Sequence, residues 1–130
     1  MVLDVLLERG PQAKPAVRLF AAVERQRITG LLGATTITTV HYLSRNALGE
    51  AGARKQMETL LRLFELAPVT RAVLDGALRL RLADFEDAVL HECARQAGAD
   101  GIVTRDPAGF RKADLRVYEP AELLAALDSM

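Results

Sequence analysis

The sequence predicts an α/β fold, a three-layer sandwich with a mostly parallel central sheet. Segments with helical apolar periodicity alternate along the chain with short, continuously apolar runs. Such runs are typical of strands that are buried on both faces, so helices are expected to cover both sides of the sheet. Half of the 130 residues are apolar, which is enough to bury the core of one domain spanning residues 1–130.

Local signals justify the elements of the first half of the chain. Pro11 suits a first helical turn, and an apolar stripe at helical spacing follows it. The run 28–33 is short, apolar and closed by glycine, which favours a strand. Thr35 or Thr36 can cap the next helix, and Gly49 breaks it. The elements expected here are a helix at 11–26, a strand at 28–33, helices at 35–48 and 50–63, and a strand at 64–69.

The second half of the chain carries clearer helix boundaries. Thr70 and Asp84 can each cap a helix, Gly98 ends the second of these, and Pro120 opens the last. The elements expected here are helices at 70–82 and 84–97, strands at 102–104 and 116–118, and a helix at 120–127.

Composition restricts the class of protein. The 17 basic and 17 acidic residues give zero formal charge, so binding to RNA would have to depend on a local basic patch. No apolar run approaches the roughly 20 residues of a membrane helix, and the start lacks the basic region of a secretory signal. A single cysteine, Cys93, cannot form an internal disulfide. These features favour a cytoplasmic protein without a membrane partner.

Acidic residues gather where a strand ends and a helix begins. Asp84 and Asp87 lie in the first turn of a predicted helix, and Asp106 follows the predicted strand 102–104. In open α/β sheets, ligand sites form just outside the carboxyl ends of the strands. Carboxylates arranged there are a plausible cage for a hard divalent cation such as Mg²⁺.

Four stretches of the chain resemble the PIN domain family. They are Ala83–Ala88, Ala97–Pro107 with Phe110, Val2–Pro11 and Ala34–Thr38. PIN domains are small α/β ribonucleases, and many are the toxin half of bacterial toxin–antitoxin pairs. The resemblance implies hydrolysis of RNA with Mg²⁺ or Mn²⁺ held by three or four carboxylates. It also implies RNA and an antitoxin protein as partners.

Two of the four metal-binding acids of the family have a counterpart in this chain. Asp87 matches the helix-borne acid and Asp106 the acid after the strand-end threonine, so the resemblance assigns both as catalytic metal ligands. The family's second acid falls at about Thr39. Its first acid, in an Asp-Thr-Asn segment ending the first strand, would precede the stretch that Val2–Pro11 resembles. The first strand is therefore expected to be absent or replaced, and two of four carboxylates to be missing.

Two arrangements of the N-terminus remain open. In one, Met1–Leu3 forms the central strand, and Asp4 stands at its end as a substitute metal ligand. In the other, Asp4 belongs to the first helix, and the empty slot is closed by flanking strands or by a neighbouring chain. A homodimer that exchanges N-terminal segments would be one such solution.

Several other side chains near the predicted site have alternative roles. Asp84 can cap its helix or assist Asp87 as a metal ligand. The basic residues that surround the site can hold phosphates or be ordinary surface charge; they are Arg105, Arg111, Lys112 and Arg116. His91 and His41 are expected to be solvated surface residues, and Cys93 a buried structural thiol.

The sequence therefore predicts a PIN-like domain derived from a divalent-metal-dependent ribonuclease of the toxin type. With two of four expected carboxylates missing, its activity in this form is expected to be weak or absent. The alternative is a non-catalytic PIN module that binds protein or nucleic acid.

Overall fold

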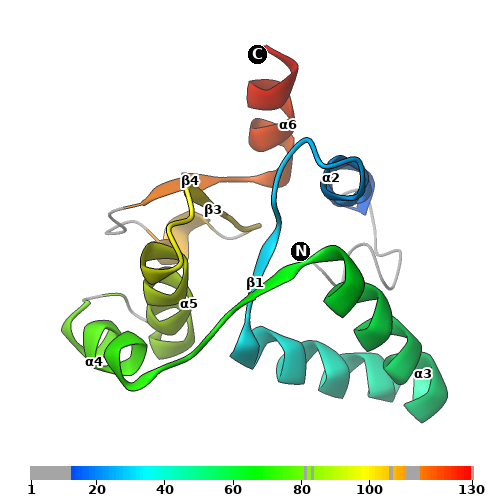
Figure 1. Ribbon diagram of the computed structural model, residues 1–130, viewed down its shortest axis with the longest axis horizontal. Coiled ribbons are helices and arrows are strands. Elements are labelled where there is room, and N and C mark those ends of the chain that lie inside the picture. The colour runs from blue at the N-terminus through cyan, green and yellow to red at the C-terminus, as the bar shows by residue number, and fades with distance from the viewer. Residues whose placement is uncertain (1–12, 81, 83, 106, 111–114, 130) are drawn as a thin grey trace. The chain divides into compact units, whose positions relative to one another are not determined.

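The computed structural model describes residues 13–80, 82, 84–105, 107–110 and 115–129 (Figure 1). The chain divides into two compact units, Met1–Leu66 and Ala67–Met130. Helices and short strands are mixed in both, which confirms the α/β class. The strands of the described residues form two two-stranded sheets, β1 with β2 and β3 with β4. The three-layer sandwich and the single domain stay predictions.

The first unit is built around one long helix. Its described elements are α2 (Ala13–Glu24), β1 (Leu31–Gly33), α3 (Ala34–Leu63) and β2 (Glu65–Ala67). The strands lie within the predicted segments but are shorter than predicted. A buried apolar cluster joins α2, β1, α3 and the residue that precedes β2. It consists of Phe20, Val23, Leu32, Val40, Leu60 and Phe64.

A glycine makes room for Phe64 in this cluster. The ring of Phe64 meets that of Phe20 edge-on, with 4.9 Å between centroids. A β-carbon on Gly30 would stand 2.5 Å from the Phe64 ring, closer than real carbon atoms approach one another. The absence of a side chain at Gly30 therefore lets Phe64 fill the core beside the β1–β2 pair.

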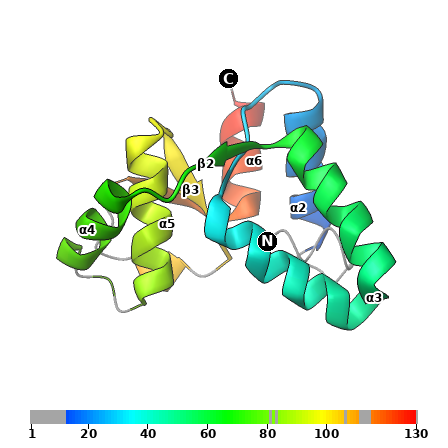
Figure 2. The same cartoon turned by 60° about the horizontal axis from the view of Figure 1, so that its bottom comes forward.

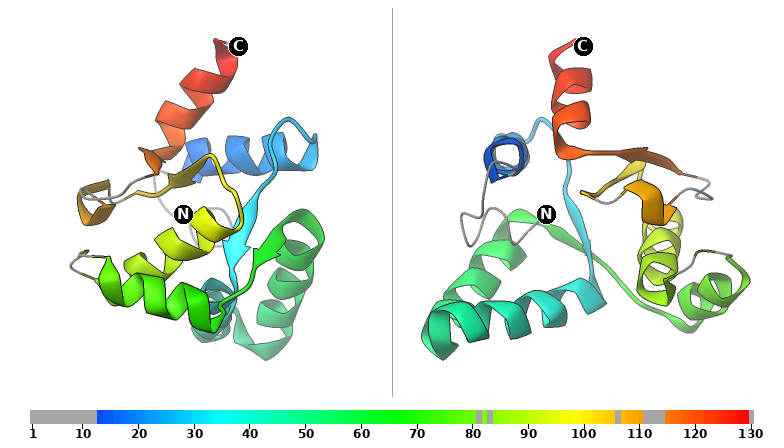
Figure 3. Two further views of the ribbon diagram at one scale, coloured as in Figure 1. Left: turned by 60° about the vertical axis from the view of Figure 1, so that its left-hand side comes forward. Right: turned by 180° about the vertical axis from the view of Figure 1, so that it is seen from behind.

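Helix α3 is broken at Gly49, as predicted. Gly49 has φ 79° and ψ 176°, a backbone conformation that is essentially restricted to glycine. Figure 3 shows the two arms of α3 diverging from this kink. Ser44 and Ala53, one in each arm, are both 0% exposed. The kink thus gives α3 buried positions on either side of the break.

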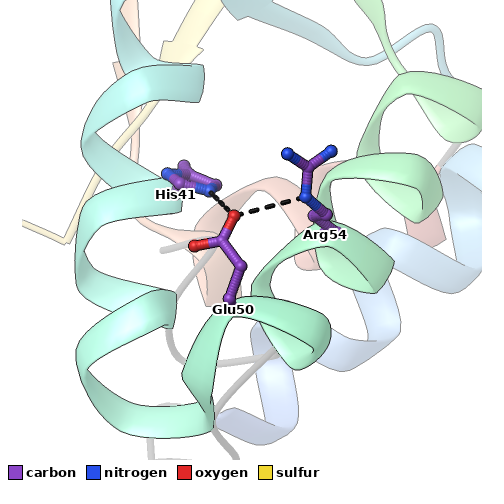
Figure 4. A network of polar contacts seen from close by, with 3 residues as sticks. All are labelled: His41, Glu50 and Arg54. Atoms are coloured by element: carbon purple, nitrogen blue, oxygen red, sulfur yellow. Dashed lines mark hydrogen bonds and ion pairs between the residues drawn. The ribbon is translucent and has the colours of Figure 1, made fainter.

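A polar network spans the same kink. The Oε1 atom of Glu50 lies 3.8 Å from Nε2 of His41 and 3.2 Å from Nε of Arg54 (Figure 4). His41 belongs to the first arm of α3, and the other two residues to the second. All three side chains are at least one third exposed, so the network stabilises the kink only modestly. The prediction that His41 is a surface residue agrees with this partial exposure.

The second unit carries the elements around the predicted site. They are α4 (Arg71–Arg79), α5 (Phe85–Gln96), β3 (Gly101–Val103), the short 3₁₀ helix η1 (Pro107–Phe110), β4 (Arg116–Tyr118) and α6 (Pro120–Asp128). Strands β3 and β4 pair in parallel, with Ile102 opposite Val117. This pair confirms that the sheet contains parallel strands, as the sequence predicts.

Helices α4 and α5 pack against each other through a second buried apolar cluster. It comprises Ala67, Val73, Ala77, Ala88, Val89 and Cys93, with Val69, Leu80 and Leu82 packed against it. Small residues from both helices allow the two backbones to approach closely. This cluster fixes the helix that bears the candidate acids.

Several helix boundaries follow the predicted caps. The Thr70 side chain accepts a hydrogen bond from the Val73 amide at 3.3 Å. Pro120 occupies the first turn of α6, and Glu119 and Glu122 form a reciprocal capping box. Gly98, with φ 78°, closes α5 in a Schellman motif, in which the Ala99 amide donates to the Ala94 carbonyl at 2.9 Å.

Two boundary predictions were wrong. Neither Thr35 nor Thr36 caps α3, because the helix already begins at Ala34 and Gly33 occupies the cap position in an extended conformation. Helix α4 ends at Arg79 rather than near residue 82, where Leu80 leaves the helical conformation at ψ 128°.

Among the helices of the described residues, none has the length and apolar character needed to cross a membrane.

Candidate metal and phosphate site

The first turn of α5 holds the described acids of the candidate site. Asp84 caps the helix, and its Oδ1 accepts a hydrogen bond from the Asp87 amide at 3.2 Å. Glu86 is exposed and Asp87 is partly buried. The partial positive charge at a helix N-terminus favours acids at these positions. The capping bond therefore fixes the backbone of Asp87 at the start of the helix.

Helix α5 runs antiparallel to β3 (Figure 2). Only the four residues 97–100 connect them, and the helix packs against the strand. The N-terminal turn of α5 consequently points toward the end at which β3 terminates. This is the arrangement in which a helix-borne carboxylate can approach groups that follow a strand.

The carboxyl ends of β3 and β4 lie at one edge of their sheet. The Thr104 amide, just after β3, donates a hydrogen bond to the Tyr118 carbonyl at 2.9 Å. This bond extends the parallel ladder by one residue beyond Val103. Arg105 follows and is exposed. Thr104, Arg105 and Tyr118 thus mark the sheet edge toward which the start of α5 is directed.

The structure places some of the predicted site residues and leaves others outside its described part. Asp84, Asp87 and Arg105 are located as above. The remaining predicted site residues lie outside the described residues; they are Asp4, Asp106, Arg111 and Lys112. Within the described ranges, no group of three or more His, Cys, Asp or Glu side chains is arranged to hold a metal ion. The pairing of Asp87 with Asp106 therefore stays a prediction.

The prediction for His91 was wrong. His91 is 0% exposed, although it lies one turn after the partly buried Asp87. The sequence favoured a solvated surface histidine at this position. Helix α5 is instead buried at three successive positions, His91, Glu92 and Cys93, because elements pack on more than one of its faces.

Cys93 is a buried thiol, as predicted. It is 2% exposed, and its Sγ lies 3.8 Å from the Pro68 carbonyl oxygen. Burial, together with the nearby Glu92 carboxylate, raises the pKa of the Cys93 thiol above its ordinary value of 9.0. Because the thiolate is the nucleophilic form, this environment suits a structural cysteine rather than a catalytic one.

Sequence reasoning missed the buried acid Glu92. Its side chain is 6% exposed, and Oε2 accepts a hydrogen bond from Nε of Arg95 at 2.6 Å. Its other oxygen, Oε1, lies against Gly76 of α4. Gly76 is the sequence signal that could have pointed to this contact. A glycine inside a helix costs stability, so it often marks a place where a neighbouring side chain needs the space.

Comparison with known proteins identifies the family of the chain. A family model described as the PIN domain matches residues 1–108, and the chain belongs to this family. Members of the family are in general nucleases and typically depend on divalent metal ions. A search of curated proteins found no relative that matches the chain.

Proposed function

We propose that the protein is a ribonuclease that hydrolyses RNA phosphodiesters with a divalent metal ion, Mg²⁺ or Mn²⁺, held by Asp87 and Asp106 in a three-layer PIN fold. The observation that carries the proposal is the position of Asp87. It is partly buried in the first turn of α5, a helix that runs antiparallel to β3, so this turn lies toward the strand's carboxyl end. Membership of the PIN family supplies the class of reaction.

The donors of the site fit a hard cation. Carboxylate oxygens are the ligands that Mg²⁺ prefers, and the ion keeps several waters when only two carboxylates bind it. Asp84 commits one oxygen to its capping bond with the Asp87 amide, so its main role is to orient Asp87. When bound, the metal ion lowers the pKa of a coordinated water and offsets charge on the phosphate. Asp4 is proposed as a further ligand.

The basic residues after β3 are proposed to bind the phosphates of the RNA substrate. Arg105 is exposed at the sheet edge and can hold a phosphate of the RNA chain, with Arg111 and Lys112 in the same role. The family resemblance adds a toxin function and an antitoxin protein as partner to the proposal. The expected arrangement of the N-terminus adds a homodimer that exchanges N-terminal segments, and the single cysteine favours a cytoplasmic location.

Turnover is expected to be low. Thr39, which is exposed on α3, occupies the position at which the family carries a second acid. Its Oγ1 donates a hydrogen bond to the Thr35 carbonyl at 3.4 Å and has no negative charge to offer. Fewer carboxylates concentrate a cation less strongly and leave fewer groups to orient the attacking water.

The same observation favours a second candidate function, a non-catalytic PIN module that binds RNA or protein. In this reading, the two remaining acids are a remnant of a metal site. The two candidates differ in one measurable property, because only the nuclease requires Asp87 for chemistry.

The test is to incubate the purified chain with single-stranded RNA in the presence of Mg²⁺ or Mn²⁺. The matched control is the double variant Asp87→Asn/Asp106→Asn, which keeps the side-chain size and removes both charges. Slow cleavage that needs the metal and disappears in the double variant supports the nuclease. Cleavage that survives in the double variant refutes the assignment of these residues, and RNA binding without cleavage favours the binding module.

A further inference from the structure

An aromatic ring and a guanidinium lie together on β4, beside the sheet edge of the candidate site. Arg116 and Tyr118 are two residues apart and therefore on the same face of the strand. The guanidinium carbon of Arg116 is 5.2 Å from the centroid of the Tyr118 ring. At this distance the cation is attracted by the face of the ring.

A glycine on the neighbouring strand makes room for this pair. Gly101 of β3 is the register partner of Arg116. A β-carbon on Gly101 would stand 3.1 Å from Cε2 of Tyr118 and 2.9 Å from the Arg116 carbonyl oxygen. The ring thus lies across the part of β3 that has no side chain. Any larger residue at position 101 would displace it.

The pair is accessible and lies on the sheet that carries the proposed metal site. Arg116 is exposed and Tyr118 is partly exposed. Tyr118 is the last residue of β4, and its carbonyl oxygen accepts the hydrogen bond from the Thr104 amide. In the sequence, Asp106 follows Thr104 by two residues. The Tyr118 ring lies back over Gly101, three residues before Thr104, so a group bound on the ring would be about 10 Å along β3 from the strand end that leads to the proposed metal ligand.

We propose that Arg116 and Tyr118 form a binding site for one unpaired base of single-stranded RNA, on the sheet that carries the proposed metal site. Bases that are not paired stack on aromatic rings and on the plane of an arginine guanidinium, whatever their sequence. Arg116 adds a positive charge for the backbone of the same nucleotide. A protein without net charge gains more from such stacking contacts than from its overall field. This inference rests on the proposed function for its substrate.

The first experiment measures the affinity for a fluorescein-labelled, single-stranded oligoribonucleotide by anisotropy, in EDTA so that no cleavage occurs. Tyr118→Leu keeps an apolar side chain over Gly101 but removes the aromatic ring, and should weaken binding about fivefold or more. Tyr118→Phe keeps the ring and should bind as the unmodified chain does. Arg116→Gln should also weaken binding. Equal affinity of the Leu and Phe variants overturns the proposal.

The second experiment does not depend on a variant of the binding pair. The chain has two tyrosines and no tryptophan, so in the variant Tyr42→Phe all tyrosine emission comes from Tyr118. Tyr42 is 64% exposed, and its loss should leave the fold intact. Titration with the unlabelled oligoribonucleotide should quench this emission, whereas a duplex of the same sequence should not. Unchanged emission at saturating oligoribonucleotide overturns the proposal.

The two proposals fail separately in these tests. Stacking on Tyr118 without metal-dependent cleavage would support the base site and refute the nuclease. Cleavage that is unaffected by Tyr118→Leu, at RNA concentrations well below saturation, would support the nuclease and refute the base site.

Discussion

The carboxylate of Glu92 on α5 lies directly against the backbone of Gly76 on α4. A β-carbon on Gly76 would stand 2.9 Å from Oε1 and 3.0 Å from Cδ of Glu92. The ion pair with Arg95 and the 6% exposure of the Glu92 side chain restrict its escape. The packing of α4 against α5 therefore depends on a position that carries no side chain.

Gly76→Ala should destabilise the protein by about 1–3 kcal/mol through overpacking, although alanine is the better helix former. The check is a double-mutant cycle with Glu92→Ala in chemical denaturation. In the Glu92→Ala background the clash is absent, so Gly76→Ala should become neutral or stabilising. Additive effects of the two substitutions would contradict the proposed contact.

The role of Asp84 can be separated into capping and metal binding. Asp84→Ala should destabilise the protein by about 1 kcal/mol, because it removes the acceptor for the Asp87 amide. Asp84→Ser caps equally well without a charge and should restore stability. Calorimetric titration with Mn²⁺ then decides the second role: if the Ser variant loses metal affinity as the Ala variant does, Asp84 is a ligand as well as a cap.

Two glycines of the described residues have positive φ, Gly49 and Gly98, and they should respond differently to asparagine. Gly49 combines φ 79° with ψ 176°, where other residues are strained by roughly 1–3 kcal/mol, so Gly49→Ala and Gly49→Asn should both be destabilising. Gly98 closes a Schellman motif, whose left-handed conformation asparagine tolerates. Gly98→Asn should therefore be less destabilising than Gly98→Ala. Thermal unfolding of the four variants checks this, and equal effects at both positions would contradict it.

Alkaline pH should weaken the fold through Cys93. The pKa of the folded thiol is raised above its ordinary value of 9.0 by burial, so the folded state holds this proton more tightly than the unfolded state. Its stabilising contribution is complete below pH 9.0 and is lost as the pH rises through the folded pKa. The stability difference between the unmodified chain and Cys93→Ala should accordingly be constant below pH 9.0 and shrink above it. A difference independent of pH up to the alkaline limit of the fold would show that Cys93 is accessible to water.

The sequence predicts those features of this protein that depend on a few neighbouring residues. Thr70, Asp84 and Gly98 mark helix boundaries because capping involves only the adjacent turn. The cap of α3 was assigned wrongly because Gly33 supplies an extended conformation without any side-chain signal. Local chemistry is thus a reliable guide where a capping side chain or a left-handed glycine marks the boundary, and it fails where an extended residue such as Gly33 begins the helix.

Properties that depend on distant contacts were harder to predict. The burial of His91 and Glu92 results from packing on several faces of α5, which the periodicity of one helix does not reveal. The pairing of Gly101 with Arg116 likewise depends on the strand register. For the candidate site, the sequence identified the acids of the α5 first turn, whereas the stacked pair on β4 required the fold.

The kink at Gly49 has a consequence for how rapidly part of the core can assemble. A straight helix of 30 residues would extend about 45 Å, and its ends could not share a cluster. With the kink, Val40 and Leu60 from the two arms join the same apolar cluster. The residues between them are helical on both sides of Gly49, and helices form within about a microsecond. Only docking of the two arms across this one hinge then remains, so the arms of α3 should form their shared core early in folding.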